Sequence, residues 1–361
     1  MSTKKIAWLD TLRVLASLSI IFVHYFMCPG FQELTRLQSC IADVSRFGVA
    51  LFFALSGWLI PASLERASSA WSFCKRKLLR VVIPFTVSWW ALGTFFVLLG
   101  LLDPPIGNLS PITYLLYAEK SQYAELLAGM FPLDISVMLF FDVKFSWFVG
   151  EWFMGTILWM YIFSPLLNKC AAKAPALSLA ASVVLSFAVY CAVELFVPVV
   201  ESWMLFPVQL PSFMLGIVMF RCREKLLLWR RRLTTASCVV LATALVNFAL
   251  NYPPEGKMFL PLDPTCFALL FPAVYLTFVA AEKLNEHSGA LLNWFNGFND
   301  VSYMCMLLQH QIIFLFAMNI EFGRLHSFGR LFVFFLITLT TVLLSAQFKK
   351  FSDAVERRLR G

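Results

Sequence analysis

The amino-acid sequence predicts an all-α, polytopic membrane protein with about ten transmembrane helices. Three observations lead to this fold class. The 361-residue chain is 60% hydrophobic and only 14% charged, whereas about a quarter of the residues in soluble domains are charged. The mean hydropathy is +0.77. Finally, apolar windows of about 17 to 25 residues, the length that spans roughly 30 Å of hydrocarbon, recur along the whole chain.

The apolar windows define the spans in chain order. The first window begins at Ile6 and carries Asp10 and Arg13; it is too long for the apolar region of a signal peptide, so we expect it to remain as a span. The one long connection, 102–145, contains DPPIGNLSP, and connections of this length are often functional. The ten predicted helices are 6–28, 44–64, 79–102, 145–167, 176–199, 203–220, 234–250, 262–281, 301–320 and 328–348.

Basic residues orient the chain, because cytoplasmic segments carry an excess of Lys and Arg. Most of the 29 Lys and Arg residues fall on one side of the predicted topology, which places both termini in the cytoplasm. The formal charge of +8 therefore indicates topology and contact with anionic membrane lipid, and we expect no nucleic-acid partner. Residues 1–361 are predicted to form a single membrane domain. The nine Cys residues show no ligand spacing, so we expect neither a metal site nor a disulfide framework.

The first predicted helix contains two ionisable residues on one face, within RVLASLSIIFVH. Arg13 and His24 are eleven residues apart, which returns to within about 20° of the same direction, roughly 16 Å further along the axis. Asp10 precedes Arg13 by three residues, a spacing that allows an ion pair. The simplest alternative is that each residue reaches its nearest interface. The shared face instead favours a path between the two aqueous sides, with Arg13 near the cytoplasmic edge and His24 near the outer edge.

Three residues on other helices are candidates for the same path. Glu151 is predicted at the depth of His24, and a protonated glutamate bonded to a neighbouring helix is the alternative. His310 is predicted near the middle of the membrane, inward of His24, where a packing histidine is the simpler interpretation. Ser56, beside Gly57, would let its helix approach a neighbour closely, which is a structural role unless Ser56 also contacts substrate.

A basic run, FCKRKLLRVVIP, precedes the third predicted span. Arg76 and Arg80 are four residues apart and share one face at the cytoplasmic mouth of this helix. They anchor the topology, or they form an anion site for a phosphate-bearing donor, for which the guanidinium group is well suited.

Taken together, these stretches resemble acyltransferase family 3, integral membrane O-acyltransferases of bacterial surface or exported carbohydrates. The arginine and histidine of the first-helix motif match Arg13 and His24, and the basic run with its proline matches Arg76, Arg80 and Pro84. Three further stretches match in order: FFALSG at 52–57, WFVG to SPLL at 147–167, and SYMCMLLQH at 302–310. The chain departs from the family pattern at Lys77, where arginine is common, and at Gln309, where many members have histidine.

The resemblance implies transfer of a short acyl group, most often acetyl, from cytoplasmic acyl-CoA to a carbohydrate hydroxyl in the bacterial inner membrane. The acceptor that the resemblance implies is an exopolysaccharide, a lipopolysaccharide or a lipid-linked oligosaccharide. We expect His24 to be the general base or a transient acyl carrier, since imidazole has a pKa of about 6.5, with Glu151 orienting it. The remaining expectations are Arg13, Arg76 and Arg80 for the CoA phosphates, and Asp10, Ser56 and His310 for substrate binding.

A secondary transporter or flippase-like protein without covalent chemistry is the rival interpretation. Ionisable residues on one membrane-embedded face also suit a permeation path. The sequence shows no inverted repeat of the kind found in many transporters. The oligomeric state and the identity of the sugar are left open by the sequence.

Overall fold

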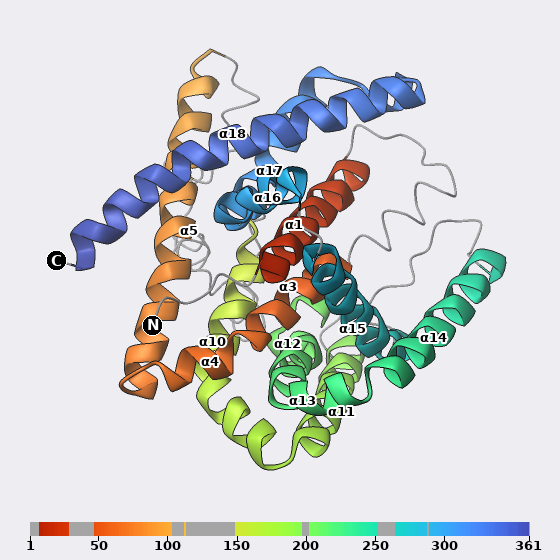
Figure 1. Ribbon diagram of the computed structural model, residues 1–361. Helices are drawn as coiled ribbons and strands as arrows, with labels where there is room; N and C mark the ends of the chain where they lie inside the picture. The colour runs from red at the N-terminus through yellow and green to blue at the C-terminus, as the bar shows by residue number, and fades with distance from the viewer. Residues whose placement is uncertain are drawn as a thin grey trace.

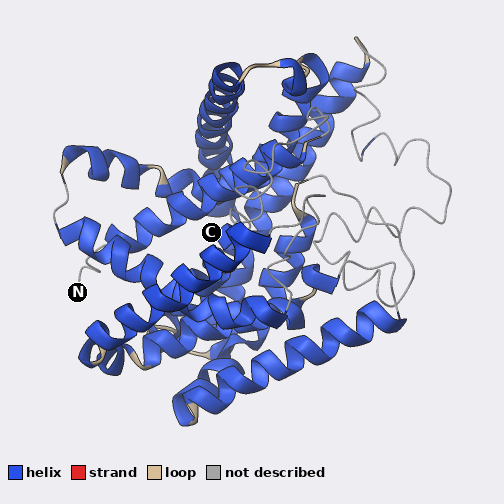
Figure 2. Ribbon diagram, turned by 90° about the vertical axis from the view of Figure 1, so that its right-hand side faces the viewer, coloured by secondary structure: helices blue, strands red, loops and turns tan. Residues whose placement is uncertain are grey.

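The computed structural model describes residues 7–28, 47–102, 112, 149–196, 202–251, 264–286 and 289–360. These residues form helices joined by short turns and loops, with no strand among them (Figure 2). Six segments are long and apolar enough to cross a membrane: Ala7–Met27, Phe47–Glu65, Ala70–Gly100, Pro175–Phe196, Asn299–Asn319 and Ser327–Arg358. The elements are α1 (Ala7–Met27), α3 (Phe47–Trp58), α4 (Ile60–Glu65), α5 (Ala70–Gly100), α10 (Glu151–Lys173), α11 (Pro175–Phe196), η2 (Ser202–Met204), α12 (Phe206–Arg221), α13 (Arg223–Leu228), α14 (Arg230–Asn251), α15 (Pro264–Glu286), α16 (Ala290–Gly297), α17 (Asn299–Asn319), η3 (Phe322–Arg324) and α18 (Ser327–Arg360).

Each predicted span has a helical counterpart, but α5 and α18 extend well beyond the spans predicted for them. Helix α5 begins at Ala70 rather than at residue 79, because Ser69 caps it by accepting a hydrogen bond from the Ser72 amide at 3.0 Å. Helix α18 extends to Arg360 rather than ending at residue 348. The basic run before the third span is therefore part of a helix. The number of helices that cross the membrane, ten, stays a prediction.

Helix α1 lies at the centre of the molecule, between α17 and α16 on one side and α3 and α15 on the other (Figure 1). Its side-chain hydrogen bonds to α16 and α17 have an almost constant register. The bonded pairs are 11 with 296, 13 with 299, 17 with 302 and 24 with 309. Helices α1 and α17 therefore run side by side in the same direction, as the predicted topology requires of two spans that both leave the cytoplasm.

Helices α3 and α12 pack backbone to backbone through two glycines. A Cβ atom added to Gly57 would lie 2.0 Å from the carbonyl oxygen of Phe213, and one added to Gly216 would lie 1.9 Å from that of Ala54. The close approach expected from Gly57 is confirmed, and Gly216 is its partner. Small residues at such crossings allow the dispersion contacts that hold membrane helices together.

Replacing Gly57 with alanine is expected to lower the thermal unfolding midpoint of the purified protein markedly. The added methyl group meets backbone atoms, which cannot move unless the two helices separate, and overpacking of this kind costs about 1–3 kcal/mol or more. The matched control is Gly297→Ala, since nothing lies within 4 Å of a Cβ atom at Gly297. Equal midpoints for the two variants would contradict the close packing of α3 on α12.

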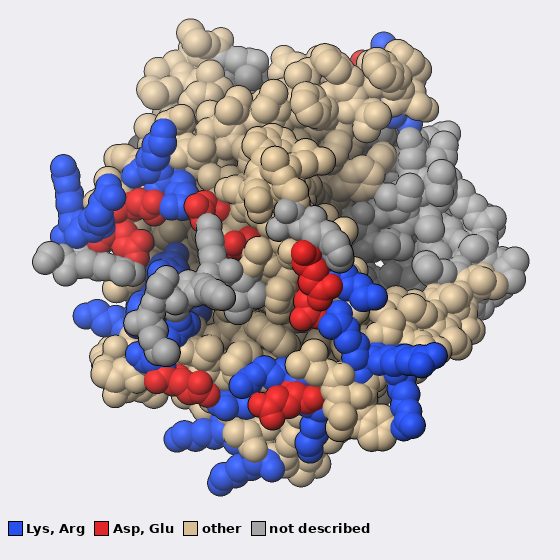
Figure 3. Space-filling view, viewed as in Figure 1, with Lys and Arg blue, Asp and Glu red and all other residues tan. Residues whose placement is uncertain are grey.

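The charged side chains are unevenly distributed over the surface. Lys and Arg gather on the left and lower parts of the face shown in Figure 3, whereas its upper part is largely uncharged. Helix α13 and the start of α14, which carry Arg223, Lys225, Arg230, Arg231 and Arg232, lie at the lower side of the same view (Figure 1). This asymmetry is what a positive-inside topology requires.

The sidedness itself is testable by cysteine labelling. With the native cysteines removed, a cysteine at Asn108, which lies outside the described residues, is expected to react with an impermeant thiol reagent added to intact cells. A cysteine at Arg231 is expected to react only after the membrane is opened. The opposite pattern would invert the predicted orientation.

Candidate functional site

The contact between α1 and α17 carries polar groups at two levels. At one level, which we name the histidine end, lie His24, Gln309 and His310. At the other, which we name the basic end, Arg13 meets the start of α17. The two levels are eleven residues apart on α1, roughly 16 Å along the helix axis.

The histidine end brings three side chains from two helices into contact. The amide nitrogen of Gln309 lies 2.9 Å from Nδ1 of His24. The imidazole rings of His24 and His310 meet edge to face, with centroids 5.3 Å apart. His310 is therefore at the depth of His24, and the prediction that it lies inward of His24 is wrong. The reason is that α17 begins at the level of Arg13, six residues into α1.

Nδ1 of His24 also lies 3.0 Å from the carbonyl oxygen of Ile20, one turn earlier on α1. Gln309 is only 2% exposed, so its contact with the imidazole is shielded from water. Gln309 was noted in the sequence only as a departure from the family pattern. The sequence feature that could have identified Gln309 is its position next to His310. Its contact with His24 depends on the register between α1 and α17, which pairs residues 285 positions apart in the sequence.

At the basic end, Arg13 is held by two oxygen atoms. Its guanidinium group donates to Oδ1 of Asp10 at 3.2 Å and to Oδ1 of Asn299 at 3.3 Å. The predicted ion pair between Asp10 and Arg13 is thus present. Asp10 is only 5% exposed, so it orients Arg13 from inside the protein, and a role in substrate binding stays a prediction.

Further cations gather around Arg13. Lys77 lies over the rings of Phe73 and Tyr161, 5.8 and 5.3 Å from their centroids, and it is repelled by Arg80, Arg13 and Arg76. Arg13 and Arg80 also repel each other. We name Arg13, Arg76, Lys77 and Arg80 the basic cluster. The structure therefore brings together all three arginines predicted to bind an anion and adds a lysine to them.

Ser56 lies with the basic cluster and not with His24. It shares a side-chain hydrogen bond with Tyr161, whose hydroxyl is within electrostatic range of Arg13 and Arg80. The neighbouring Tyr303 donates a hydrogen bond to the Val81 carbonyl at 2.8 Å and ties α17 to α5. Of the three predicted substrate contacts, Asp10 and Ser56 are thus at the basic end, and only His310 is beside His24.

Glu151, the predicted partner of His24, is the first residue of α10, after Gly150 in the left-handed conformation (φ 79°). Its side chain lies outside the described residues, so its predicted role stays a prediction.

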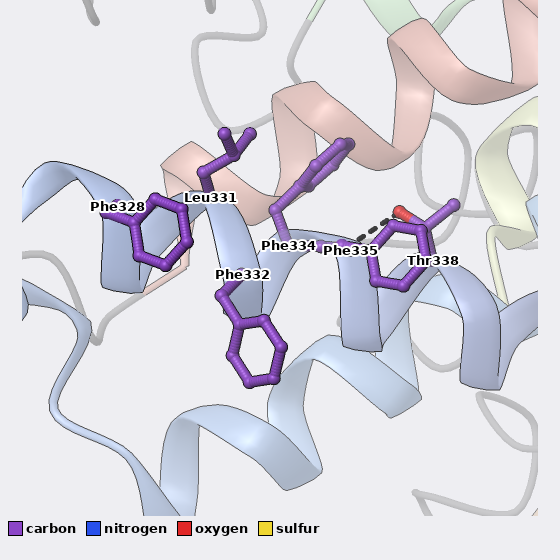
Figure 4. Close-up of a pocket in the computed structure, with 6 residues that line it drawn as sticks. All are labelled: Phe328, Leu331, Phe332, Phe334, Phe335 and Thr338. Carbon is purple, nitrogen blue, oxygen red and sulfur yellow. Dashed lines mark hydrogen bonds between the residues drawn. The ribbon is translucent and has the colours of Figure 1, made fainter.

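A pocket of about 440 Å³ lies on α18 (Figure 4). Its lining is apolar apart from the hydroxyl of Thr338, which donates to the Phe334 carbonyl at 2.8 Å. The Phe334 ring packs against Phe22 of α1, with centroids 5.1 Å apart. The lining residues are Phe328, Leu331, Phe332, Phe334, Phe335 and Thr338. The pocket is therefore an apolar surface on α18 that contacts α1 through Phe334, and its lining holds no group that could transfer a proton.

A family model described as an acyltransferase domain matches residues 6–348 of the chain. Comparisons with curated proteins and with solved structures give no significant match. The matched segment includes both the histidine end and the basic cluster, and it agrees with the resemblance carried by the sequence motifs. With its apolar helices, the chain is a multi-pass membrane protein, and it belongs to acyltransferase family 3.

Proposed function

We propose that the protein transfers a short acyl group, acetyl, from cytoplasmic acyl-CoA to a hydroxyl of a surface or exported carbohydrate across the bacterial inner membrane. One observation carries the proposal. The contact of α1 with α17 has a cluster of cations from α1 and α5 at one end. At its other end, Nδ1 of His24 lies 3.0 Å from the Ile20 carbonyl oxygen and 2.9 Å from the Gln309 amide nitrogen. These are the two kinds of group that an acyl-CoA-dependent transfer requires.

The basic cluster supports binding of the donor. Lys77 is repelled by all three arginines of the cluster, and Arg13 and Arg80 repel each other. Among the described contacts, the salt bridge of Arg13 with Asp10 is the one that joins this cluster to a carboxylate. A ligand with several phosphate oxygens, such as CoA, would relieve this repulsion. Arginine binds phosphate in a bidentate manner, and Asp10 with Asn299 fixes the direction of the Arg13 fork.

The histidine end supports the chemical step. A hydroxyl is a weak nucleophile until a base within hydrogen-bond reach removes its proton. In the proposed reaction, His24 takes that proton while the hydroxyl oxygen bonds to the thioester carbonyl carbon. The carbon–sulfur bond then breaks, and the CoA thiolate receives the proton from the imidazolium. The separation of the two ends, roughly 16 Å, is bridged by the extended pantetheine arm of the donor.

The experiment that tests this function is acyl transfer by the purified protein in lipid vesicles. Radiolabelled acetyl-CoA is supplied with an extract of cell-surface glycans or their lipid-linked precursors. The expected result is label in the carbohydrate as an alkali-labile ester. Mass spectrometry of glycans from cells with and without the protein then identifies the acceptor. No transfer to any glycan and no release of CoA would contradict the proposal.

A further inference from the structure

Two groups approach the same nitrogen of His24, and as placed they make opposite demands on it. The Ile20 carbonyl oxygen, 3.0 Å from Nδ1, accepts hydrogen bonds only and needs a hydrogen on Nδ1. The Gln309 amide nitrogen, 2.9 Å from Nδ1, donates only and needs a lone pair there. In the neutral ring Nδ1 carries one or the other. One of the two contacts must therefore be assigned differently.

The carbonyl decides which contact changes. A backbone oxygen in a helix cannot exchange places with another atom, whereas the oxygen and nitrogen of a glutamine amide are assigned from the surrounding hydrogen bonds. When the amide oxygen and nitrogen of Gln309 are exchanged, Oε1 faces Nδ1 of His24. The Nδ1–H group of His24 then donates to both Oε1 of Gln309 and the Ile20 carbonyl oxygen. The other end of the amide does not decide between the two orientations, because Oε1 as placed is buried without a hydrogen-bond partner and the amide nitrogen would take that position after the exchange.

We infer that Gln309 is a positioning residue that, with the Ile20 carbonyl, holds His24 as the Nδ1–H tautomer. The lone pair of the imidazole then lies on Nε2. This inference rests on the proposed function for its catalytic consequence, but the tautomer itself does not. The arrangement corresponds to the third group of a catalytic triad, which orients the base and fixes its tautomer, with a neutral amide in place of a carboxylate.

The consequence for the reaction concerns both ring nitrogens. Nε2 takes the proton of the acceptor hydroxyl and later returns it to the CoA sulfur. During this interval Nδ1–H stays bonded to two oxygen atoms, each carrying partial negative charge, which stabilises the imidazolium. The edge-to-face contact with His310 further restricts rotation of the ring.

The tautomer is measured directly by nitrogen NMR of protein labelled with ¹⁵N-histidine in lipid vesicles, with no substrate present. The chain has four histidines, and the signal lost in His24→Ala assigns His24. For neutral His24 in the wild-type protein, we expect a protonated Nδ1 and an unprotonated Nε2. We expect the signal of the hydrogen-bonded Nδ1 to shift in Gln309→Met and to keep its position in Gln309→Glu. A neutral His24 protonated on Nε2, or a Gln309→Met spectrum identical to the wild type, would overturn the inference.

Kinetics give the second readout. Gln309→Met is expected to lower kcat by about 10- to 100-fold, the range known for hydrogen-bond partners that orient metal-bound histidines, with little change in the KM for acyl-CoA. Gln309→Glu keeps an oxygen acceptor and is expected to recover most of the rate. The matched control is Gln311→Met, a change of another buried glutamine of α17. Equal losses in the two methionine variants would overturn the positioning role.

The two measurements separate the inference from the proposed function. The expected tautomer in a protein that transfers no acyl group would refute the function and leave the placement of Gln309 intact. Acyl transfer by a protein whose His24 is protonated on Nε2 would refute the placement and leave the function intact.

Discussion

Replacing His24 with alanine is expected to lower acyl transfer to carbohydrate by about 10²- to 10⁴-fold, the contribution typical of a general base. Without the His24 imidazole, the acceptor hydroxyl loses the proposed base that Gln309 and the Ile20 carbonyl contact. Binding of acyl-CoA is expected to persist, because the basic cluster lies roughly 16 Å away along α1. The measurement is the initial rate of transfer at matched amounts of protein in the membrane.

Two histidine variants serve as controls for this result. His326→Ala makes the same change at an exposed residue in the turn before α18, and it is expected to leave the rate unchanged. His310→Ala removes the ring packed on His24 but leaves the base, so its loss is expected to fall between the other two. Near-normal transfer by His24→Ala would show that His24 is not the base and only packs against its neighbours.

Replacing Arg80 with alanine is expected to weaken acyl-CoA binding by about 10- to 100-fold. A hydrogen bond to a charged group contributes about 1.5–3 kcal/mol, and each 1.4 kcal/mol is about tenfold in affinity. Arg80 is exposed, so its removal leaves no buried charge unpaired. Arg13→Ala is expected to weaken binding as well, but it also removes an ion-pair partner of the buried Asp10. The measurement is equilibrium binding of labelled acyl-CoA to the protein in vesicles.

The matched control for Arg80 is Arg223→Ala on α13. Arg223 is also an exposed arginine, and it stacks on Phe220 outside the basic cluster. We expect donor affinity to be unchanged in this variant. Equal acyl-CoA affinities for Arg80→Ala and the wild type would show that the basic cluster only anchors the topology and does not bind the donor.

The sequence predicted the helices well where hydropathy alone decides. It was less accurate where a helix leaves the apolar layer. Helix α5 starts nine residues early because the Ser69 cap and the basic run favour helix while lowering hydropathy. Helix α18 continues through Lys349 and Lys350, which lower the hydropathy without ending the helix. The short helices α13 and α16 were not predicted, because neither has the length of a span.

For the candidate site, the sequence predicted what depends on one helix. The shared face of Arg13 and His24 and the ion pair of Arg13 with Asp10 follow from helical geometry. The depth of His310 was wrong because the sequence does not reveal the offset between α1 and α17. That offset arises where α16 packs beside the start of α1, with Thr11 donating to Asn296 at 2.6 Å. The contact of Gln309 with His24 depends on the same offset.

The central claim is that donor binding and proton transfer occur at opposite ends of one helix contact. The most direct test measures acyl-CoA affinity and transfer at saturating acyl-CoA for His24→Ala and Arg80→Ala in the same vesicles. We predict a crossed result: His24→Ala binds the donor normally and does not transfer, whereas Arg80→Ala binds weakly and transfers at near wild-type rate once saturated. Loss of both properties in both variants, or of neither, would contradict the claim.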